Sequence, residues 1–147
     1  MSDCQENIVA AALSLVGTPF HHAAALKGIG CDCVGVLIYT AKAVGLIAHD
    51  WRPAVYSREW HIHKNQQLLQ ETMESLGFAP VPLGERQPGH VLVFQFGRVL
   101  SHAGILVSAT PETLVHSIIN LGVRHHGLTG DLLSRLRAVY TFPEVRA

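Results

Sequence analysis

The residue best suited to covalent chemistry is Cys33, which lies between a glycine-containing loop and a run of apolar residues at helical spacing. That spacing predicts a helix that begins at Cys33 and ends near Gly45. Asp32 is a favourable N-cap residue, so the Cys33 thiol is expected in the first helical turn. Unpaired backbone N–H groups and the positive end of the helix dipole stabilise a thiolate there. We therefore expect Cys33 to have a lowered pKa and to act as a nucleophile, rather than as a small buried cysteine.

Two histidines could supply the base that a nucleophilic cysteine needs. His102 begins the segment 102–108 and His116 lies in the segment 113–119, and both segments have the character of short strands bounded by turn residues. If these strands are antiparallel neighbours, the two imidazoles can lie side by side on one face of a sheet. Each histidine alone is also explained as a hydrogen-bonded, partly buried side chain. Together with Cys33 at a helix start, the pair favours a catalytic site.

The elements that must position these side chains follow from the apolar patterning. Residues 5–16 have helical periodicity, and residues 131–136 are expected to form a short helix. Helices followed by strands indicate an α+β fold, in which the N-terminal helices, including the one that starts at Cys33, pack on a C-terminal antiparallel sheet of about five strands. The expected strands are residues 91–96, 102–108, 113–119, 122–126 and 138–142.

The stretch between residues 47 and 82 is less regular. Residues 66–77 have the spacing of a helix, and residues 78–82 are expected to be an extended connection. The aromatic residues of this stretch are expected to pack beneath a loop, and the alternative is that they line a groove. They are Trp51, Tyr56 and Trp60.

Length and composition indicate a single globular domain over residues 1–147. Hydrophobic residues make up 48% of the chain and charged residues 15%, which is enough apolar material for a hydrophobic core. Lysine plus arginine equals aspartate plus glutamate at 11 each, without a basic stripe, so nucleic-acid binding is not supported. No segment has the length or pattern of a membrane span or a secretory signal, and three cysteines do not suggest a disulfide framework. We expect synthesis in the cytoplasm without an export signal, and no association with a membrane.

Four short motifs, taken in order and spacing, resemble the NlpC/P60 family of cysteine peptidases. The resemblance extends from about residue 5 to residue 143, and it is to the phage-tail branch in particular, whose members often carry a Pro-Tyr-x-His segment before an Asp-Cys-x-Gly motif. The segment Phe20-His21-His22 stands at the place of the first of these. The four motifs are Gly17-Thr18-Pro19-Phe20, Gly30-Cys31-Asp32-Cys33-Val34-Gly35-Val36, Pro88-Gly89-His90-Val91 and Ser101-His102-Ala103-Gly104-Ile105.

The resemblance implies a papain-like fold and hydrolysis of peptidoglycan stem peptides, commonly at the bond from D-glutamate to a diamino acid. Carried over residue by residue, it makes Cys33 the nucleophile, His102 the base and His116 the third residue, which orients the base. In the expected resting state the Cys33 thiolate and the His102 imidazolium form an ion pair. Asp32 resembles the aspartate that precedes the cysteine in the family, and we interpret it as a helix cap and loop anchor.

Two further residues are expected to support the substrate or the oxyanion together with Asp32. Phe20 stands where many relatives have a tyrosine, so a hydroxyl near the nucleophile is missing. His21 or His22 is expected to replace it, and His22 is the better match. The expected partners are peptidoglycan stem peptides and phage tail proteins. The expected site of action is the cell wall, reached as part of a phage particle or after lysis. Neither a metal nor another cofactor is expected.

Three other interpretations stay open. A structural zinc site is disfavoured because the Cys-x-Cys pair lacks the usual spacing of zinc ligands, and because consecutive residues of a strand point to opposite faces. A non-catalytic binding or tail-assembly module is disfavoured because all three catalytic candidates are present. Thiol amidase or acyltransferase chemistry on the same scaffold is not excluded, since a fold does not fix the substrate. The residues weighed for the metal site are Cys31, Cys33, His61, His63, His125 and His126.

Overall fold

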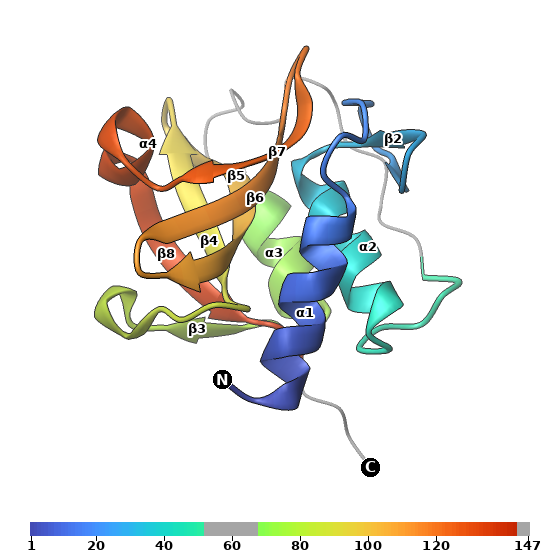
Figure 1. The fold of residues 1–147 in the computed structure, drawn as a ribbon, viewed down its shortest axis with the longest axis horizontal. Coiled ribbons are helices and arrows are strands. Elements are labelled where there is room, and N and C mark those ends of the chain that lie inside the picture. The colour runs from blue at the N-terminus through green and yellow to red at the C-terminus, as the bar shows by residue number, and fades with distance from the viewer. Residues whose placement is uncertain (52–67, 144–147) are drawn as a thin grey trace.

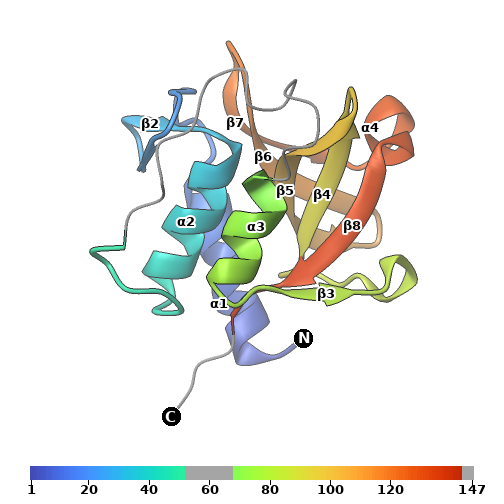
Figure 2. The same ribbon diagram turned by 180° about the vertical axis from the view of Figure 1, so that it is seen from behind.

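The computed structural model describes residues 1–51 and 68–143, which form an α+β fold with three helices against one face of an antiparallel sheet (Figure 1). Figure 2 shows α3 beside α2 with α1 behind them, and all three helices contact β5. The helices are α1 (Asp3–Ser14), α2 (Cys33–Ala43), α3 (Leu68–Ser75) and α4 (Gly130–Ser134), with a 3₁₀ turn at Leu83–Glu85. The strands are β1 (Ala25–Leu26), β2 (Gly30–Cys31), β3 (Ala79–Val81), β4 (Val91–Phe96), β5 (Val99–Ala109), β6 (Glu112–Ile118), β7 (Gly122–Gly127) and β8 (Leu136–Thr141).

The described residues build one six-stranded sheet in the order β3-β8-β4-β5-β6-β7, in which all neighbours are antiparallel. All five expected strands are present, and β5 begins earlier than expected. The additional strand is β3, which we had expected to be an extended connection. It contains Pro80, which has no N–H to donate to a neighbouring strand, and it lies at the sheet edge, where a proline is tolerated. A separate hairpin of β1 and β2 leads into α2.

The hydrophobic core has two parts, one on each face of the sheet. Val91 and Val93 of β4 face the core that α1, α2 and α3 share with the sheet. Leu92 and Phe94 of the same strand face a second core, which β8 and α4 help to enclose. All four side chains are fully buried. A strand buried on both faces has a continuous apolar run, which is why residues 91–94 lack the usual alternation.

The loop between α1 and β1 is joined to the sheet by backbone hydrogen bonds. The Gly17 N–H donates to the Val123 carbonyl at 3.0 Å, and the Val123 N–H donates to the Thr18 carbonyl at 2.8 Å. Gly122 has a φ of +83°, and a Cβ there would overlap the Thr18 carbonyl oxygen, so this position requires glycine. The loop that precedes the Cys33 helix is thereby held against β7.

Several sequence-based expectations lie wholly or partly outside the described residues. The helix expected over 66–77 is described from Leu68, and it ends at Ser75. Among the aromatic and histidine residues weighed above, Tyr56, Trp60, His61 and His63 are outside the described ranges. None of the helices in residues 1–51 and 68–143 has the length and apolar character needed to cross a bilayer.

Candidate active site

A pocket of about 640 Å³ brings together all six residues singled out from the sequence. It lies where the first turn of α2 meets β5, β6 and β7. The six residues are Phe20, His22, Asp32, Cys33, His102 and His116. The other lining residues are Phe96, Ser101, Ser117, Ile118, Ile119, His126, Thr129, Asp131 and Leu132.

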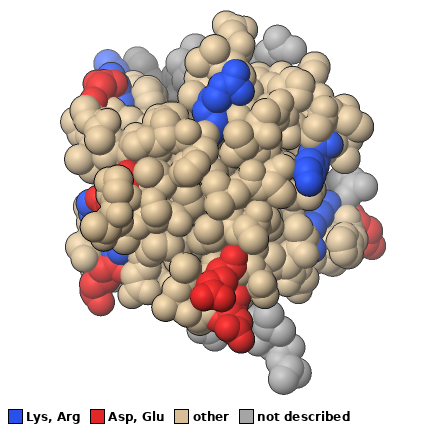
Figure 3. All heavy atoms as spheres, in the orientation of Figure 1, with Lys and Arg blue, Asp and Glu red and all other residues tan. Residues whose placement is uncertain are grey.

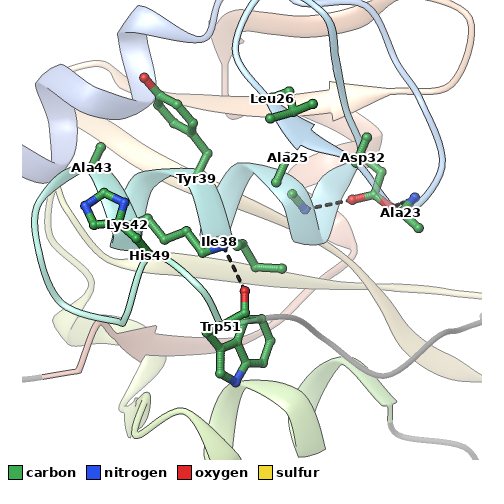
Figure 4. A pocket seen from close by; sticks show the side chains of 12 residues that line it. Ala23, Ala25, Leu26, Asp32, Ile38, Tyr39, Lys42, Ala43, His49 and Trp51 are labelled. Atoms are coloured by element: carbon green, nitrogen blue, oxygen red, sulfur yellow. Dashed lines mark hydrogen bonds between the residues drawn. The ribbon is translucent and has the colours of Figure 1, made fainter.

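Cys33 is the first residue of α2, and Asp32 is its N-cap. One carboxylate oxygen of Asp32 accepts from the Gly35 N–H at 2.7 Å, and the other accepts from the Ala23 N–H at 2.7 Å. Figure 4 shows this carboxylate between the helix and the loop that carries Ala23. The expectation that Asp32 caps the helix and anchors the loop is confirmed.

The loop before β1 packs directly on the first turn of α2. The Ala24 carbonyl accepts a hydrogen bond from the Asp32 N–H at 3.1 Å, which holds this carbonyl close to the helix. At Gly35 an added Cβ would overlap the Ala24 carbonyl oxygen and lie 3.0 Å from the Cys31 sulfur. The glycine two residues after Cys33 is therefore required by close packing of the loop against the helix.

The segment that leads to Cys33 is also bonded to the strand that carries His116. The Ser117 hydroxyl donates to the Cys31 carbonyl at 2.6 Å across 86 residues of sequence. Both Ser117 and Cys31 are buried. The Cys31 N–H in turn donates to the Pro19 carbonyl at 2.9 Å. These bonds fix the start of α2 relative to β6.

The two candidate imidazoles are hydrogen-bonded to each other. Nε2 of His102 and Nδ1 of His116 are 2.7 Å apart. The His116 side chain is only 4% exposed, and the His102 ring packs against Phe94 and Phe96, with ring centroids 5.8 and 5.7 Å apart. The expectation that these histidines lie side by side on neighbouring strands is confirmed.

The resting protonation state differs from the expected ion pair. Burial and, to a smaller extent, the Asp32 carboxylate together raise the pKa of the Cys33 thiol to about 12, and the backbone amides of Ala103, Val34 and Cys33 counteract this only in part. Burial also lowers the pKa of His102 to about 4. The thiol donates to the Ser101 carbonyl, with Sγ 3.8 Å from the oxygen. The expected thiolate–imidazolium pair is thus wrong for the free protein, because lost solvation outweighs the helix dipole.

This neutral state predicts a steep pH dependence for alkylation of Cys33 by iodoacetamide. From about pH 6 to about pH 9 the rate is expected to rise about tenfold per pH unit, because the whole range lies below the thiol pKa. The measurement is the alkylation rate by mass spectrometry in a Cys4→Ser protein. Cys4 is exposed and would otherwise react, whereas Cys31 is fully buried. A rate that stays constant over this range would show a preformed thiolate and contradict the neutral pair.

Asp32→Asn is expected to lower the free energy of unfolding by about 1–3 kcal/mol. Both carboxylate oxygens of Asp32 accept backbone N–H groups, and an asparagine can accept only one of these bonds while turning an N–H donor toward the other. The measurement is urea-induced unfolding. The matched control is Asp131→Asn, which weakens an exposed ion pair with Arg135 and should change stability by less than about 1 kcal/mol. Equal unfolding midpoints for the two variants would contradict the anchoring role of Asp32.

Asp32 also lines a second pocket, of about 630 Å³, on the flank of α2 (Figure 4). Tyr39, Lys42, His49 and Trp51 contribute to its wall, and the Lys42 ammonium donates to the Trp51 carbonyl at 2.8 Å. In residues 1–51 and 68–143, no three His, Cys, Asp or Glu side chains are arranged as a metal site. Charged side chains are few and scattered over the face drawn in Figure 3. This second pocket is not lined by a cysteine, whereas the pocket at Cys33 combines a nucleophile with hydrogen-bonded imidazoles.

Among the polar lining residues that sequence reasoning did not place in the site, His126 and Ser117 are hydrogen-bonded to residues of the site or of the segment before Cys33. His126 was weighed only as a metal ligand together with His125, yet its Nε2 lies 2.7 Å from Nε2 of His116. Ser117 was not considered. The alternation of β7 correctly places His125 and His126 on opposite faces, since His125 contacts Thr113 instead. The pairing of β6 with β7 was the missing information.

Comparisons with known proteins give matches to solved structures. A Staphylococcus aureus protein described as similar to a lipoprotein of the NLP/P60 family superposes with a TM-score of 0.65 at 14% identity, over 99% of this chain and 43% of that chain. The NlpC/p60 domain of the peptidoglycan hydrolase SagA gives 0.64 at 17% identity, over 93% and 97%. RipD of Mycobacterium tuberculosis, described as a non-catalytic NlpC/p60 domain protein adapted to peptidoglycan binding, gives 0.58 at 10% identity, over 96% and 98%.

These matches concern the fold and not the sequence. No protein-family model and no curated protein sequence matches the chain. The chain spans about two fifths of the length of the S. aureus protein and of a Bacillus cereus NlpC/P60 family protein. The superposed structures cover 93% or more of this chain. The protein therefore has the α+β fold of NlpC/P60 proteins.

Proposed function

We propose that this chain is a cysteine peptidase of the NlpC/P60 family that hydrolyses amide bonds in the stem peptides of peptidoglycan. The observation that carries the proposal is that Cys33, at a helix start, and the hydrogen-bonded pair His102 and His116 line the same pocket. The fold supports the same assignment, because solved proteins of this fold include a peptidoglycan hydrolase. The proposed scissile bond joins D-glutamate to a diamino acid.

In the proposed first step, the thiol of Cys33 attacks the amide carbonyl carbon. Its proton passes to the free nitrogen of His102 as the sulfur–carbon bond forms, which matches the neutral resting pair. The backbone N–H of Cys33 has no acceptor within the helix, and with a neighbouring donor it stabilises the oxyanion. The carbon–nitrogen bond then breaks, and the leaving amine takes the proton from His102. A thioester on Cys33 remains.

In the proposed second step, water hydrolyses the thioester. His102 accepts a proton from the water as its oxygen bonds to the carbonyl carbon, and it returns that proton to the departing sulfur of Cys33. The products are a carboxylic acid and the free thiol, so the protein returns to its starting state. His116 orients the His102 ring in both steps. Asp32 holds the helix start, and Phe20 and His22 line the side of the pocket where substrate binds.

The proposal is tested by incubating soluble peptidoglycan fragments with the Cys4→Ser protein and identifying the products by mass spectrometry. Two products are expected, whose summed mass exceeds that of the fragment by one water molecule. One ends with D-glutamate, and the other begins with the diamino acid. The same protein alkylated on Cys33 is the control, and it should release no products. Cleavage that survives complete alkylation, or no cleavage by protein with a free Cys33 thiol, would overturn the proposal.

The same experiment separates two other functions. Binding of the fragments without cleavage would indicate a non-catalytic module, as described for RipD. Transfer of the acyl group to an added amine, without hydrolysis, would indicate an acyltransferase. No specific observation favours the binding module or the acyltransferase over the peptidase, because Cys33, His102 and His116 all line the pocket.

We also propose that the protein acts at the cell wall as a component of a phage or prophage tail. The support is the resemblance of the segment around Phe20 and His22 to the phage-tail branch of the family. Delivery by a particle, or release on lysis, would bring the protein to peptidoglycan. Mass spectrometry of purified particles tests this, and particles that lack the chain would contradict it.

A further inference from the structure

His126 completes a row of three hydrogen-bonded imidazoles that begins at His102. Nε2 of His102 is 2.7 Å from Nδ1 of His116, and Nε2 of His116 is 2.7 Å from Nε2 of His126. At the far end, Nδ1 of His126 lies 3.0 Å from the Gly127 carbonyl oxygen. The His116 ring is buried, and the His126 ring is exposed at the pocket wall. Each histidine comes from a different strand, and the three strands lie side by side (Figure 1).

The strand register explains why the three rings line up. His116 pairs with Arg124, so His126 lies two residues further along β7 and is a diagonal neighbour on the same face. Ile105 pairs with Val115, which places Gly104 opposite His116 and makes His102 a diagonal neighbour on the other side. A Cβ at Gly104 would lie 3.0 Å from the His116 Cβ. The glycine therefore leaves the space in which the His116 ring lies.

The Gly127 carbonyl decides which nitrogens carry protons when the imidazoles are neutral. A carbonyl oxygen only accepts, so Nδ1 of His126 carries a proton and its Nε2 is an acceptor. Nε2 of His116 must then donate to His126, which leaves Nδ1 of His116 to accept from Nε2 of His102. A neutral imidazole has one N–H, so Nδ1 of His102 is left with its lone pair.

We propose that His126 is a positioning residue of the active site, which keeps Nδ1 of His102 free to accept a proton. This inference rests on the proposed peptidase function, because it assigns His126 a part in the proton transfer from Cys33. His126 acts only through His116, and no contact of its own with the thiol is involved. The residue extends the Cys33–His102–His116 site by one member.

Loss of the acceptor on residue 126 releases the constraint on His116. In His126→Leu, Nε2 of His116 has no acceptor from β7, so the His116 proton can move to Nδ1. Nδ1 of His116 then donates to Nε2 of His102, and the proton of His102 moves to its Nδ1. A protonated Nδ1 cannot accept the thiol proton, so kcat is expected to fall about 100-fold, at the lower end of what a general base contributes. KM should change little, since no substrate contact is removed.

Two matched variants separate positioning from structural damage. His126→Gln keeps an acceptor oxygen for His116 and an N–H donor for Gly127, so it should recover most of kcat. His125→Leu changes the neighbouring histidine on the opposite face, which contacts Thr113 and lies outside the row. That variant should keep the kcat of the unchanged protein.

The deciding measurement is ¹⁵N NMR of histidine side chains at mildly alkaline pH, which reports the tautomer without any turnover. We expect an unprotonated Nδ1 on His102 in the unchanged protein and in His126→Gln, and a protonated Nδ1 in His126→Leu. If His126→Leu keeps both the original tautomers and the original kcat, the inference is wrong and the proposed function stands. If the tautomers shift as expected but the unchanged protein cleaves no stem peptide, the proposed function is wrong and the imidazole row stands.

Discussion

Cys33→Ala is expected to lower the rate of stem-peptide hydrolysis by at least about 10⁴-fold, below the detection limit of most assays. In the proposed mechanism the sulfur forms the bond to the acyl group, and no neighbouring group replaces it. Cys31 is close in sequence, but its side chain is fully buried and burial raises the pKa of its thiol. The measurement is release of product from purified stem peptides under conditions in which the unchanged protein completes the reaction.

The fold of the Cys33→Ala protein should be intact. The sulfur makes one weak hydrogen bond, to the Ser101 carbonyl, and alanine is favourable in the first turn of a helix. The melting temperature should therefore stay within a few degrees of the original. Cys4→Ser is the matched control, since it removes an exposed thiol outside the pocket and should keep full activity. Hydrolysis by Cys33→Ala at more than a trace level would remove Cys33 from the mechanism.

Gly35→Ala is expected to destabilise the protein by at least about 4 kcal/mol, one of the largest effects of a single methyl group in this chain. Intrinsic helix propensity predicts the opposite sign, because alanine is favoured over glycine inside a helix by about 1 kcal/mol. Here the new Cβ would overlap the Ala24 carbonyl oxygen. That carbonyl is held in place by the Asp32 N–H, so the backbone cannot simply move aside.

The measurement for Gly35→Ala is the midpoint of urea-induced unfolding, together with the yield of folded protein. Gly84→Ala is the matched control, because nothing lies within 4 Å of an added Cβ there and its backbone is not left-handed. Its midpoint should be close to that of the unchanged protein. If Gly35→Ala unfolds at the same urea concentration as Gly84→Ala, the close packing at the start of α2 is not what requires the glycine.

Most of the helices and strands could be predicted from the sequence, because burial dictates their patterns. Residues 91–96 were predicted with the observed bounds, since a strand buried on both faces has a distinctive apolar run. The strand β3 was missed because Pro80 argues against pairing, and only its place at the sheet edge resolves the conflict. Whether a segment lies at an edge depends on the tertiary fold and is not encoded locally.

That the candidate residues lie in one pocket could be predicted in part. A thiol at a helix start and histidines on adjacent strands were enough to place Cys33, His102 and His116 in one site. The contact of His126 with His116 was not predictable, because it depends on the register of β6 and β7. Register also shifts within β5, between Leu106 and Ser108, and such irregularities are not visible in sequence patterns.

The protonation state of Cys33 could not be predicted from local sequence. The helix start indicated a thiolate, and that local effect is present as backbone amides that lower the pKa. Burial and the Asp32 carboxylate act in the opposite direction and are larger. Burial of Cys33 depends on how β5 lies against α2, which requires the folded chain.

Because the Ser117 hydroxyl donates to the Cys31 carbonyl, the complete site can form only after β6 has been synthesised. A ribosome releases α2 well before it has made β5, β6 and β7, so a nascent chain carries the thiol while the three imidazoles do not yet exist. Until Ser117 has emerged and paired, the segment before Cys33 can bond only to residues made earlier, such as Pro19 and Ala24, and it is not yet tied to the sheet. Under the proposed function, a chain that ends before β5 lacks His102, His116 and His126 and therefore cannot carry out the proposed hydrolysis.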